Sequence, residues 1–141
     1  MDIGSAGALL YWCEGSKRER DRRVEFVNSD PRMISIFMRY LRSKEVDEDR
    51  IRIRMMIHLQ DDEVACREFW KVATGLQDAS FMRSIVKRTG LVKRPLPFGT
   101  IAVRYNSLAL LREIKTDIAR VVEALCQDVS RTPHQHISVP G

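Results

Sequence analysis

Basic side chains that alternate with apolar ones are the residues of this chain best suited to chemistry with an anionic partner. Between residues 50 and 60 every second position is apolar, and the intervening positions include Arg52, Arg54 and His58. Side chains of a β-strand point alternately to its two faces, so the pattern predicts a strand with one face in a core and guanidinium groups on the other. Arginines arranged in this way can bind phosphate oxygens and guanine edges.

A second basic region covers residues 79–112, which contain no aspartate or glutamate. Its seven basic residues are Arg83, Lys87, Arg88, Lys93, Arg94, Arg104 and Arg112. The whole chain carries a net charge of +5, so the rest of the chain sums to −2. The positive charge is therefore local and favours a polyanionic partner. It coincides with two predicted strands, residues 81–88 and 100–105, which we expect to form a hairpin.

Helices and strands alternate along the sequence in an order that favours an α+β fold. Capping residues such as Asp30, which precedes Pro31, and helix-ending ones such as Gly15 help to place the helices. We expect helices at residues 3–14, 31–43, 61–75 and 107–127, and strands at residues 24–28, 50–60, 81–88 and 100–105. This order is typical of an antiparallel or mixed sheet with helices on one face. We predict one domain over residues 1–128 and a flexible tail over residues 129–141.

The face of the sheet that the helices leave free is the predicted binding surface for double-stranded DNA. A basic sheet can lie in the major groove, and the acid-free stretch is unusual for a surface that is merely solvated, although solvation remains the alternative. RNA is disfavoured because no aromatic pair on this face is available to stack unpaired bases. The predicted DNA-binding residues are Lys17, Arg18, Arg52, Arg54, Arg83, Lys87, Arg88, Lys93, Arg94 and Arg104.

Several other classes of protein are excluded by composition and motifs. Cys13, Cys66 and Cys126 form no CxxC pair, so we expect reduced thiols in a cytoplasmic protein rather than a zinc site or disulfide framework. The apolar run at residues 6–13 is too short to span a membrane, and its basic cluster follows it, unlike that of a secretory signal. No glycine-rich phosphate loop is present, so we expect no nucleotide cofactor.

Residues 7–15, in the first predicted helix, read G-A-L-L-Y-W-C-E-G. This stretch resembles the LAGLIDADG motif, the signature helix of a family of homing endonucleases. The second and fourth residues match the motif, Cys13 replaces its second alanine, and Glu14 and Gly15 match its acidic residue and last glycine. Leu9 and Trp12 depart from it. The resemblance covers roughly residues 7–125 and is closest to short bacterial relatives with a Y-W-x-E-G-S-K string. Relative to the family's usual order, the first hairpin is reduced and the helix at residues 61–75 is additional.

The resemblance implies a homodimer that cleaves DNA with a divalent metal ion. Family members with one motif pack their motif helices together, which assigns the dimer interface to Gly4, Gly7, Ala8 and Tyr11. The implied metal ligands are Glu14 and Gly15, with Mg²⁺ or Mn²⁺ as the ion, which would stabilise charge on the scissile phosphate. A polar residue of the sheet assists in such enzymes; we assign Lys87 to this role, with Arg54, His58 and Gln60 as alternatives.

Glu14 also has an independent physical argument. A carboxylate in the last turn of a helix opposes the helix dipole, and a bound cation would offset that cost; the alternative is an ordinary exposed glutamate. Three functions therefore stay open. The first is a site-specific, metal-dependent DNA endonuclease acting as a homodimer. The second is a catalytically inactive, DNA-binding transcriptional regulator on the same fold, and the third is an interaction domain that binds no nucleic acid.

Overall fold

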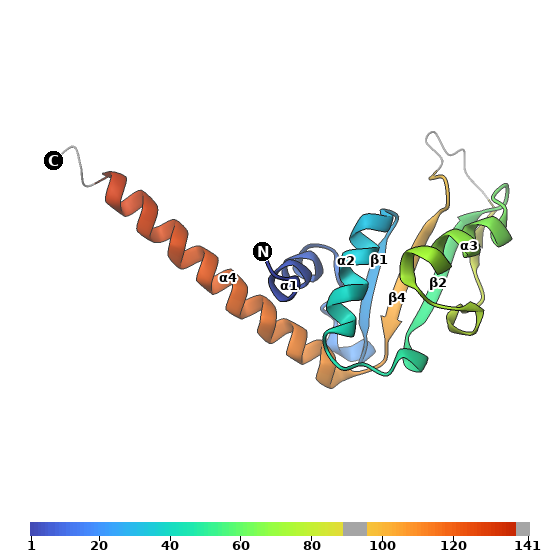
Figure 1. The fold of residues 1–141 in the computed structure, drawn as a ribbon, viewed down its shortest axis with the longest axis horizontal. Helices are drawn as coiled ribbons and strands as arrows, with labels where there is room; N and C mark the ends of the chain where they lie inside the picture. The colour runs from blue at the N-terminus through green and yellow to red at the C-terminus, as the bar shows by residue number, and fades with distance from the viewer. Residues whose placement is uncertain (89–95, 138–141) are drawn as a thin grey trace.

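The computed structural model describes residues 1–88 and 96–137, with side chains described as far as residue 127. Its helices and strands follow the predicted order, so the α+β class is confirmed (Figure 1). Short 3₁₀ turns η1 (Glu19–Asp21), η2 (Glu48–Arg50) and η3 (Asp78–Ser80) connect them. The main elements are α1 (Ile3–Glu14), β1 (Val24–Asn28), α2 (Pro31–Arg42), β2 (Arg52–His58), α3 (Glu63–Thr74), β3 (Ile85–Lys87), β4 (Thr100–Tyr105) and α4 (Leu108–Ile137).

The four strands form one mixed sheet in the order β1-β4-β2-β3. β4 is antiparallel to both β1 and β2, whereas β3 is parallel to β2. The predicted hairpin of residues 81–88 with 100–105 is therefore wrong, because α3 carries the chain back to the far side of β2. The predicted strand is also shorter than expected. The chain touches β2 once at Phe81, in an isolated bridge to Ile53, and rejoins the ladder only at Ile85.

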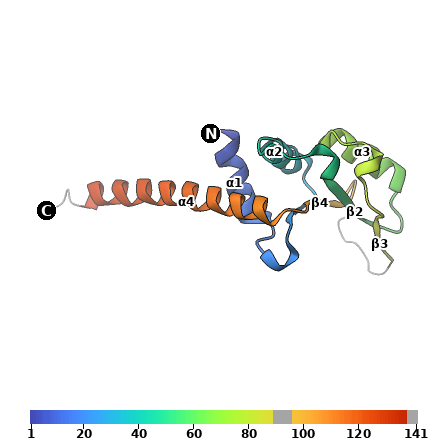
Figure 2. The same cartoon turned by 90° about the horizontal axis from the view of Figure 1, so that it is seen from below.

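α2 and α3 cover one face of the sheet, and the described helices leave the opposite face open (Figure 2). The covered face of β2 buries Ile53, Met55 and Ile57, as the alternation in the sequence predicts. On β1, Phe26 stacks on Phe37 of α2 with ring centroids 4.5 Å apart. This apolar layer fixes which side chains of each strand must point to the open face, since neighbouring residues alternate between faces.

α1 packs against α2 and against the β1 edge of the sheet. Gly7 lies so close to α2 that a Cβ atom there would come within 2.0 Å of the Tyr40 ring. At the other end of α1, the buried Tyr11 hydroxyl accepts a hydrogen bond from the backbone N–H of Glu25 at 3.2 Å and donates one to the carbonyl of Ser16. The C-terminal end of α1 is thereby tied to β1.

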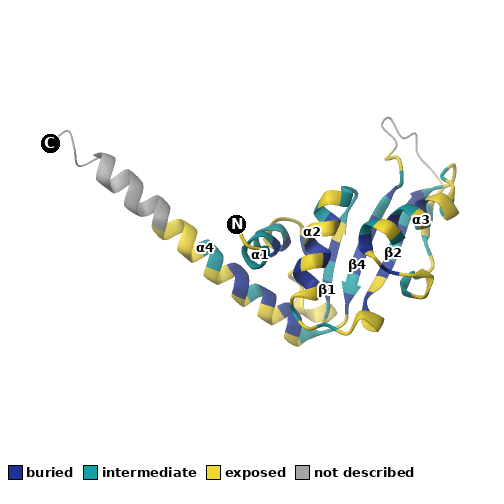
Figure 3. Cartoon of the chain, in the orientation of Figure 1, coloured by how far each residue is buried: buried dark blue, intermediate teal, exposed yellow. Residues whose placement is uncertain are grey.

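α4 is longer than predicted and projects beyond the rest of the fold (Figure 1). Its burial falls along its length, from fully buried Ile114 through Ile118 to Leu125, which is 46% exposed (Figure 3). The helix continues to Ile137 rather than ending at residue 127, because no glycine or other helix-ending residue directly follows that position. Most of the segment predicted as a flexible tail is thus helical in backbone, and residues 138–141 lie outside the described part of the chain. In that described part, no helix is long and apolar enough to cross a membrane.

Candidate nucleic-acid interface

The open face of the sheet is the surface that the strand register assigns to side chains pointing away from α2 and α3. Directly paired residues of neighbouring strands share a face, so the register sorts this surface into rows. One row joins Glu25, Arg104 and Arg52, and the next joins Val27, Ala102 and Arg54. The complete open face consists of Glu25, Val27, Arg52, Arg54, Met56, His58, Ile85, Lys87, Thr100, Ala102 and Arg104.

Three cations of the open face have no carboxylate partner among the described residues: Arg52, Arg54 and Lys87. Arg52 donates from Nη1 to the backbone carbonyl of Ile51 at 3.0 Å. Arg54 reaches only the sulfur of Met82, 4.0 Å from Nη2, and its Nε is buried without a partner. A buried donor without an acceptor costs free energy, and so do neighbouring like charges; an anion bound at the exposed part of the face would offset the second cost.

The fourth cation, Arg104, is paired. Its Nε donates to Glu25 Oε2, and Arg23 Nη2 lies 3.3 Å from the same carboxylate oxygen. The three side chains are 20–31% exposed. Sequence reasoning identified Arg104 but missed Glu25 and Arg23. The alternation of residues 23–27 placed Arg23 and Glu25 on one face of β1, but nothing local indicated that β4 would be the neighbour of β1.

The predicted residues Lys17 and Arg18 belong to the segment between α1 and β1. This segment protrudes on the open side of the sheet (Figure 2). Lys17 Nζ donates to the carbonyl of Trp12 at 2.7 Å, and Arg18 Nε lies 3.6 Å from Asp21 Oδ2. Glu19 anchors the segment to α4 through Arg112 Nε at 2.7 Å and Lys115 Nζ at 3.1 Å. These pairs hold the pKa of the Glu19 carboxyl below its ordinary value. The acidic residues of the segment are therefore paired with cations.

Of the other predicted DNA-binding residues, the structure places only some on the open face. Lys87 lies on the open face opposite His58 in the parallel register of β2 and β3. Arg83 and Arg88 are exposed but lie outside β3, so the prediction that Arg83 shares a strand face with Lys87 is wrong. Lys93 and Arg94 lie outside the described residues.

Glu14, the predicted metal ligand, is the last residue of α1 and is exposed. Gly15 beside it pairs with Phe26 in an isolated bridge, and a Cβ there would come within 2.3 Å of the Tyr11 ring, so the glycine has a packing role of its own. No group of three or more histidine, cysteine or acidic side chains that could hold a metal occurs within the described ranges.

The structure does not bring Lys87 to Glu14. Glu14 is fixed beside β1, whereas Lys87 belongs to β3 at the opposite edge of the sheet. Three strand spacings separate these edges, roughly 14 Å of sheet. Lys87 therefore cannot assist Glu14 of its own chain. Of the alternatives, Arg54 and His58 lie on the open face of β2, whereas Gln60 follows β2 and is exposed.

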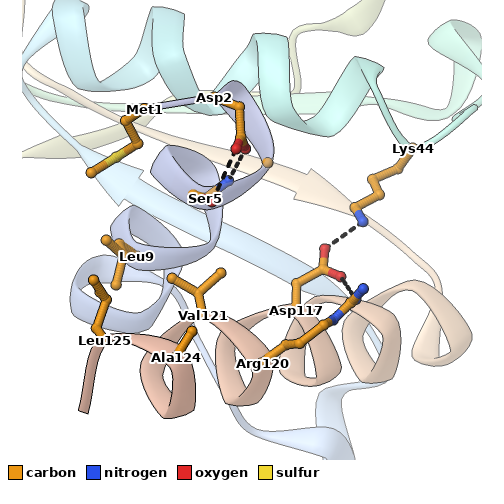
Figure 4. A pocket seen from close by; sticks show the side chains of 11 residues that line it. Met1, Asp2, Ser5, Leu9, Lys44, Asp117, Arg120, Val121, Ala124 and Leu125 are labelled. Atoms are coloured by element: carbon orange, nitrogen blue, oxygen red, sulfur yellow. Dashed lines mark hydrogen bonds and ion pairs between the residues drawn. The ribbon is translucent and has the colours of Figure 1, made fainter. Parts of the chain in front are cut away.

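Most of the predicted dimer residues are buried in their own chain. Gly7, Ala8 and Tyr11 face α2 and the core, while Gly4 borders a groove of about 490 Å³ between α1 and α4 (Figure 4). At one end of this groove, Asp117 Oδ1 accepts from Arg120 at 2.7 Å, and its other oxygen pairs with Lys44. The apolar part is lined by Met1, Leu9, Val121, Ala124 and Leu125. A second copy could therefore contact the exposed side of α1 and this groove, but not the buried side of α1.

Comparisons of the chain with protein-family models, with curated proteins and with solved structures found no match. The chemistry of the open face is therefore the basis for assigning a function.

Proposed function

We propose that this protein binds double-stranded DNA through the open face of its sheet. The observation that supports this most directly is the excess of positive charge on that face. Its described residues include four cations, Arg52, Arg54, Lys87 and Arg104, and one carboxylate, Glu25. Three of these cations have no ion pair among the described residues. The segment with Lys17 and Arg18 extends the basic surface on the same side. A duplex supplies a regular array of phosphates that would neutralise such cations and release condensed counterions.

We further propose that the fold is of the LAGLIDADG type. The motif-like residues 7–15 support this, as does the position of α1, whose acidic end is tied to β1 at the edge of the sheet. Where the family has a first hairpin, this chain has the single strand β1, and α3 is additional. Since the strands that carry the cations are present, this difference leaves the proposed DNA-binding surface intact.

Cleavage of DNA by a homodimer is the more specific proposal. Glu14 at the exposed end of α1 would supply one carboxylate from each copy to a Mg²⁺ or Mn²⁺ ion, with phosphate and water oxygens completing its shell. Such an ion would stabilise negative charge on the scissile phosphate. The alternative is a DNA-binding regulator that does not cleave, which is favoured by the distance between Lys87 and Glu14 within one chain.

DNA binding is tested by fluorescence anisotropy of a mixed-sequence duplex over a salt series, with Ca²⁺ in place of Mg²⁺ to prevent cleavage. We expect log Kd to rise linearly with log salt, by about 0.9 for each phosphate contacted. Replacing Arg52 and Arg54 by alanine should weaken binding and lower that slope by about 1.8, the contribution of two phosphate contacts. Arg39→Ala is the control, because Arg39 is an exposed cation of α2 on the covered side of the sheet. Absence of binding at low salt, or an equal loss with Arg39→Ala, would contradict the proposal.

Cleavage is tested with the duplex sequences that the protein selects from a random pool, incubated with Mg²⁺ or Mn²⁺. Strand breaks that disappear with Glu14→Gln, while binding in Ca²⁺ is retained, would establish the endonuclease. Tight, site-specific binding without strand breaks in either metal would establish the regulator instead.

Dimerisation through the exposed side of α1 is tested by sedimentation. A Cβ at Gly4 would meet only Asp2 Oδ1, at 3.2 Å, so Gly4→Leu should leave the fold intact and weaken a dimer that uses this side. Gly7→Leu should instead destabilise the monomer, because of the 2.0 Å approach to the Tyr40 ring. A dimer unaffected by Gly4→Leu would place the interface elsewhere.

A further inference from the structure

Arg104 differs from the other cations of the open face in having its guanidinium held by a carboxylate. Its Nε is bonded to Glu25 Oε2 on β1, and Arg23 Nη2 lies 3.3 Å from the same oxygen. Glu25 and Arg104 are directly paired across β1 and β4, and both side chains are only about one-fifth exposed. The guanidinium of Arg104 is thus oriented before any ligand arrives, and holding it costs little further side-chain entropy.

This arrangement leaves the distal edge of the Arg104 guanidinium available. Within the described part of the chain, only its Nε makes a hydrogen bond or ion pair, so the terminal nitrogens are not engaged. Two parallel N–H groups in a fixed plane match the O6 and N7 acceptors of guanine in the major groove. The same fork can bind two oxygens of a phosphate, but only contact with a base makes affinity depend on sequence.

The neighbouring cations have the opposite character. Arg52 lies directly across from Arg104 on β2, and Arg54 lies one row further along the same strand. Neither contacts a carboxylate: Arg52 donates to backbone carbonyls, and Arg54 reaches a methionine sulfur. No carboxylate of the described residues neutralises their charges, which suits contact with phosphates and a role in affinity rather than in sequence recognition.

We propose that Arg104, held by Glu25, reads a guanine in the major groove and determines base preference, whereas Arg52 and Arg54 contact phosphates. This inference rests on the proposed DNA-binding function and adds the base and the residue that recognises it. Glu25 acts as a positioning residue, because it orients the guanidinium and does not itself contact the base.

The test is selection of bound duplexes from a random-sequence pool, followed by affinity measurements on duplexes that differ at single G·C pairs. The wild-type protein should select at least one guanine position. Arg104→Ala and Arg104→Lys should lower discrimination at that position by roughly 5- to 150-fold, the range for one bidentate contact. Arg104→Lys keeps the charge and loses only the planar fork, so it separates recognition from electrostatics. Arg54→Ala is the control: it should weaken binding to all sequences and keep the guanine preference.

Glu25→Gln gives the outcome that a merely structural ion pair would not produce. It removes a negative charge from the face, so overall affinity for DNA should rise, while preference for the guanine should fall because Arg104 is no longer fixed. If the wild-type protein binds DNA but the same guanine survives in Arg104→Ala or in Arg104→Lys, the assignment of Arg104 is overturned and DNA binding stands. If the wild-type protein binds no duplex at low salt, both proposals fail together.

Discussion

Two groups of cations in this protein have very different surroundings. In the corner between α4, α1 and α2, Asp117 pairs with Lys44 and Arg120 and accepts a 2.6 Å hydrogen bond from the Tyr40 hydroxyl. On the open face, Arg54 has a buried Nε without any acceptor and no carboxylate within reach among the described residues. Asp117 neutralises the first group, whereas the second has no carboxylate partner among the described residues.

The comparison shows why counting charges along a sequence is not enough. Arg112 belongs to the acid-free stretch of residues 79–112, yet Glu19, which lies 93 positions earlier, neutralises it. Arg52 and Arg54 lie close to three acidic residues in sequence, at 47–49, and form no ion pair with them. The pairing that the fold creates, and not the local net charge, determines which cations remain available to a polyanion.

The largest expected effect is on DNA affinity. Arg52→Glu combined with Arg54→Glu should weaken duplex binding by about 100-fold or more at moderate salt, because two attractive contacts with phosphates become repulsive. Arg112→Ala combined with Lys115→Ala, which removes cations already paired with Glu19, should change affinity by no more than a few-fold. Anisotropy titrations of both double variants test this; equal losses would show that pairing does not distinguish the two groups.

The next effect is on stability and has opposite signs in the two regions. Asp117→Ala leaves the Tyr40 hydroxyl without its acceptor and leaves Lys44 with Glu113 alone, 3.4 Å from Nζ, so it should lower the free energy of unfolding by about 2 kcal/mol. Arg54→Met removes an unsatisfied donor and a like-charge repulsion, so it should raise the free energy of unfolding by about 0.5 kcal/mol. Urea denaturation measures both. A stabilising Asp117→Ala would contradict the comparison.

Asp117 should also make stability depend on pH. Burial alone would raise the pKa of its carboxyl, but the bonds from Lys44 and Tyr40 outweigh burial and hold the pKa below its ordinary value. A carboxyl with a lowered folded pKa contributes stability that is complete above the unfolded pKa of about 3.9, and this stability is lost as the pH falls through the folded pKa. Urea denaturation between pH 2 and 6 should therefore show an acid-side loss in the wild type that is smaller in Asp117→Asn.

The smallest expected effect comes from releasing paired cations. Glu19→Gln frees Arg112 and Lys115, so the protein should gain affinity for DNA at low salt by a few-fold, with a steeper salt dependence. The gain should vanish in high salt, since exposed charges are screened there. An unchanged salt dependence would mean that the start of α4 lies away from the bound duplex.

Local patterns predicted the elements well because each depends on neighbours in sequence. The period of residues 50–60 placed β2 and both of its faces correctly, and Asp30 caps α2, with its side chain accepting from Arg32, as the Asp30-Pro31 pair indicates. The partner of each strand could not be predicted, because register depends on distant segments. The sequence therefore predicts β3 beside β4, whereas the structure has it beside β2.

The same limit applies to the candidate site. Arg52, Arg54, Lys87 and Arg104 reach the open face as predicted, since strand alternation is enough to orient them. The ion pair of Glu25 with Arg104 joins residues 79 positions apart, and the separation of Lys87 from Glu14 follows from their places at opposite edges of the sheet. No local signal carries either fact.

The central place of β4 has a consequence for the order in which the protein folds. β4 lies between β1 and β2, although it is the last strand in the chain. A chain emerging from the ribosome can form α1, α2 and α3 early, but β1 and β2 have no common neighbour until residues 100–105 have been made. Both ladders of β4 close long loops, and such contacts form slowly because the loop entropy must be lost first. The complete basic face therefore needs residues 100–105, and a nascent chain that ends before them lacks the strand that joins β1 to β2.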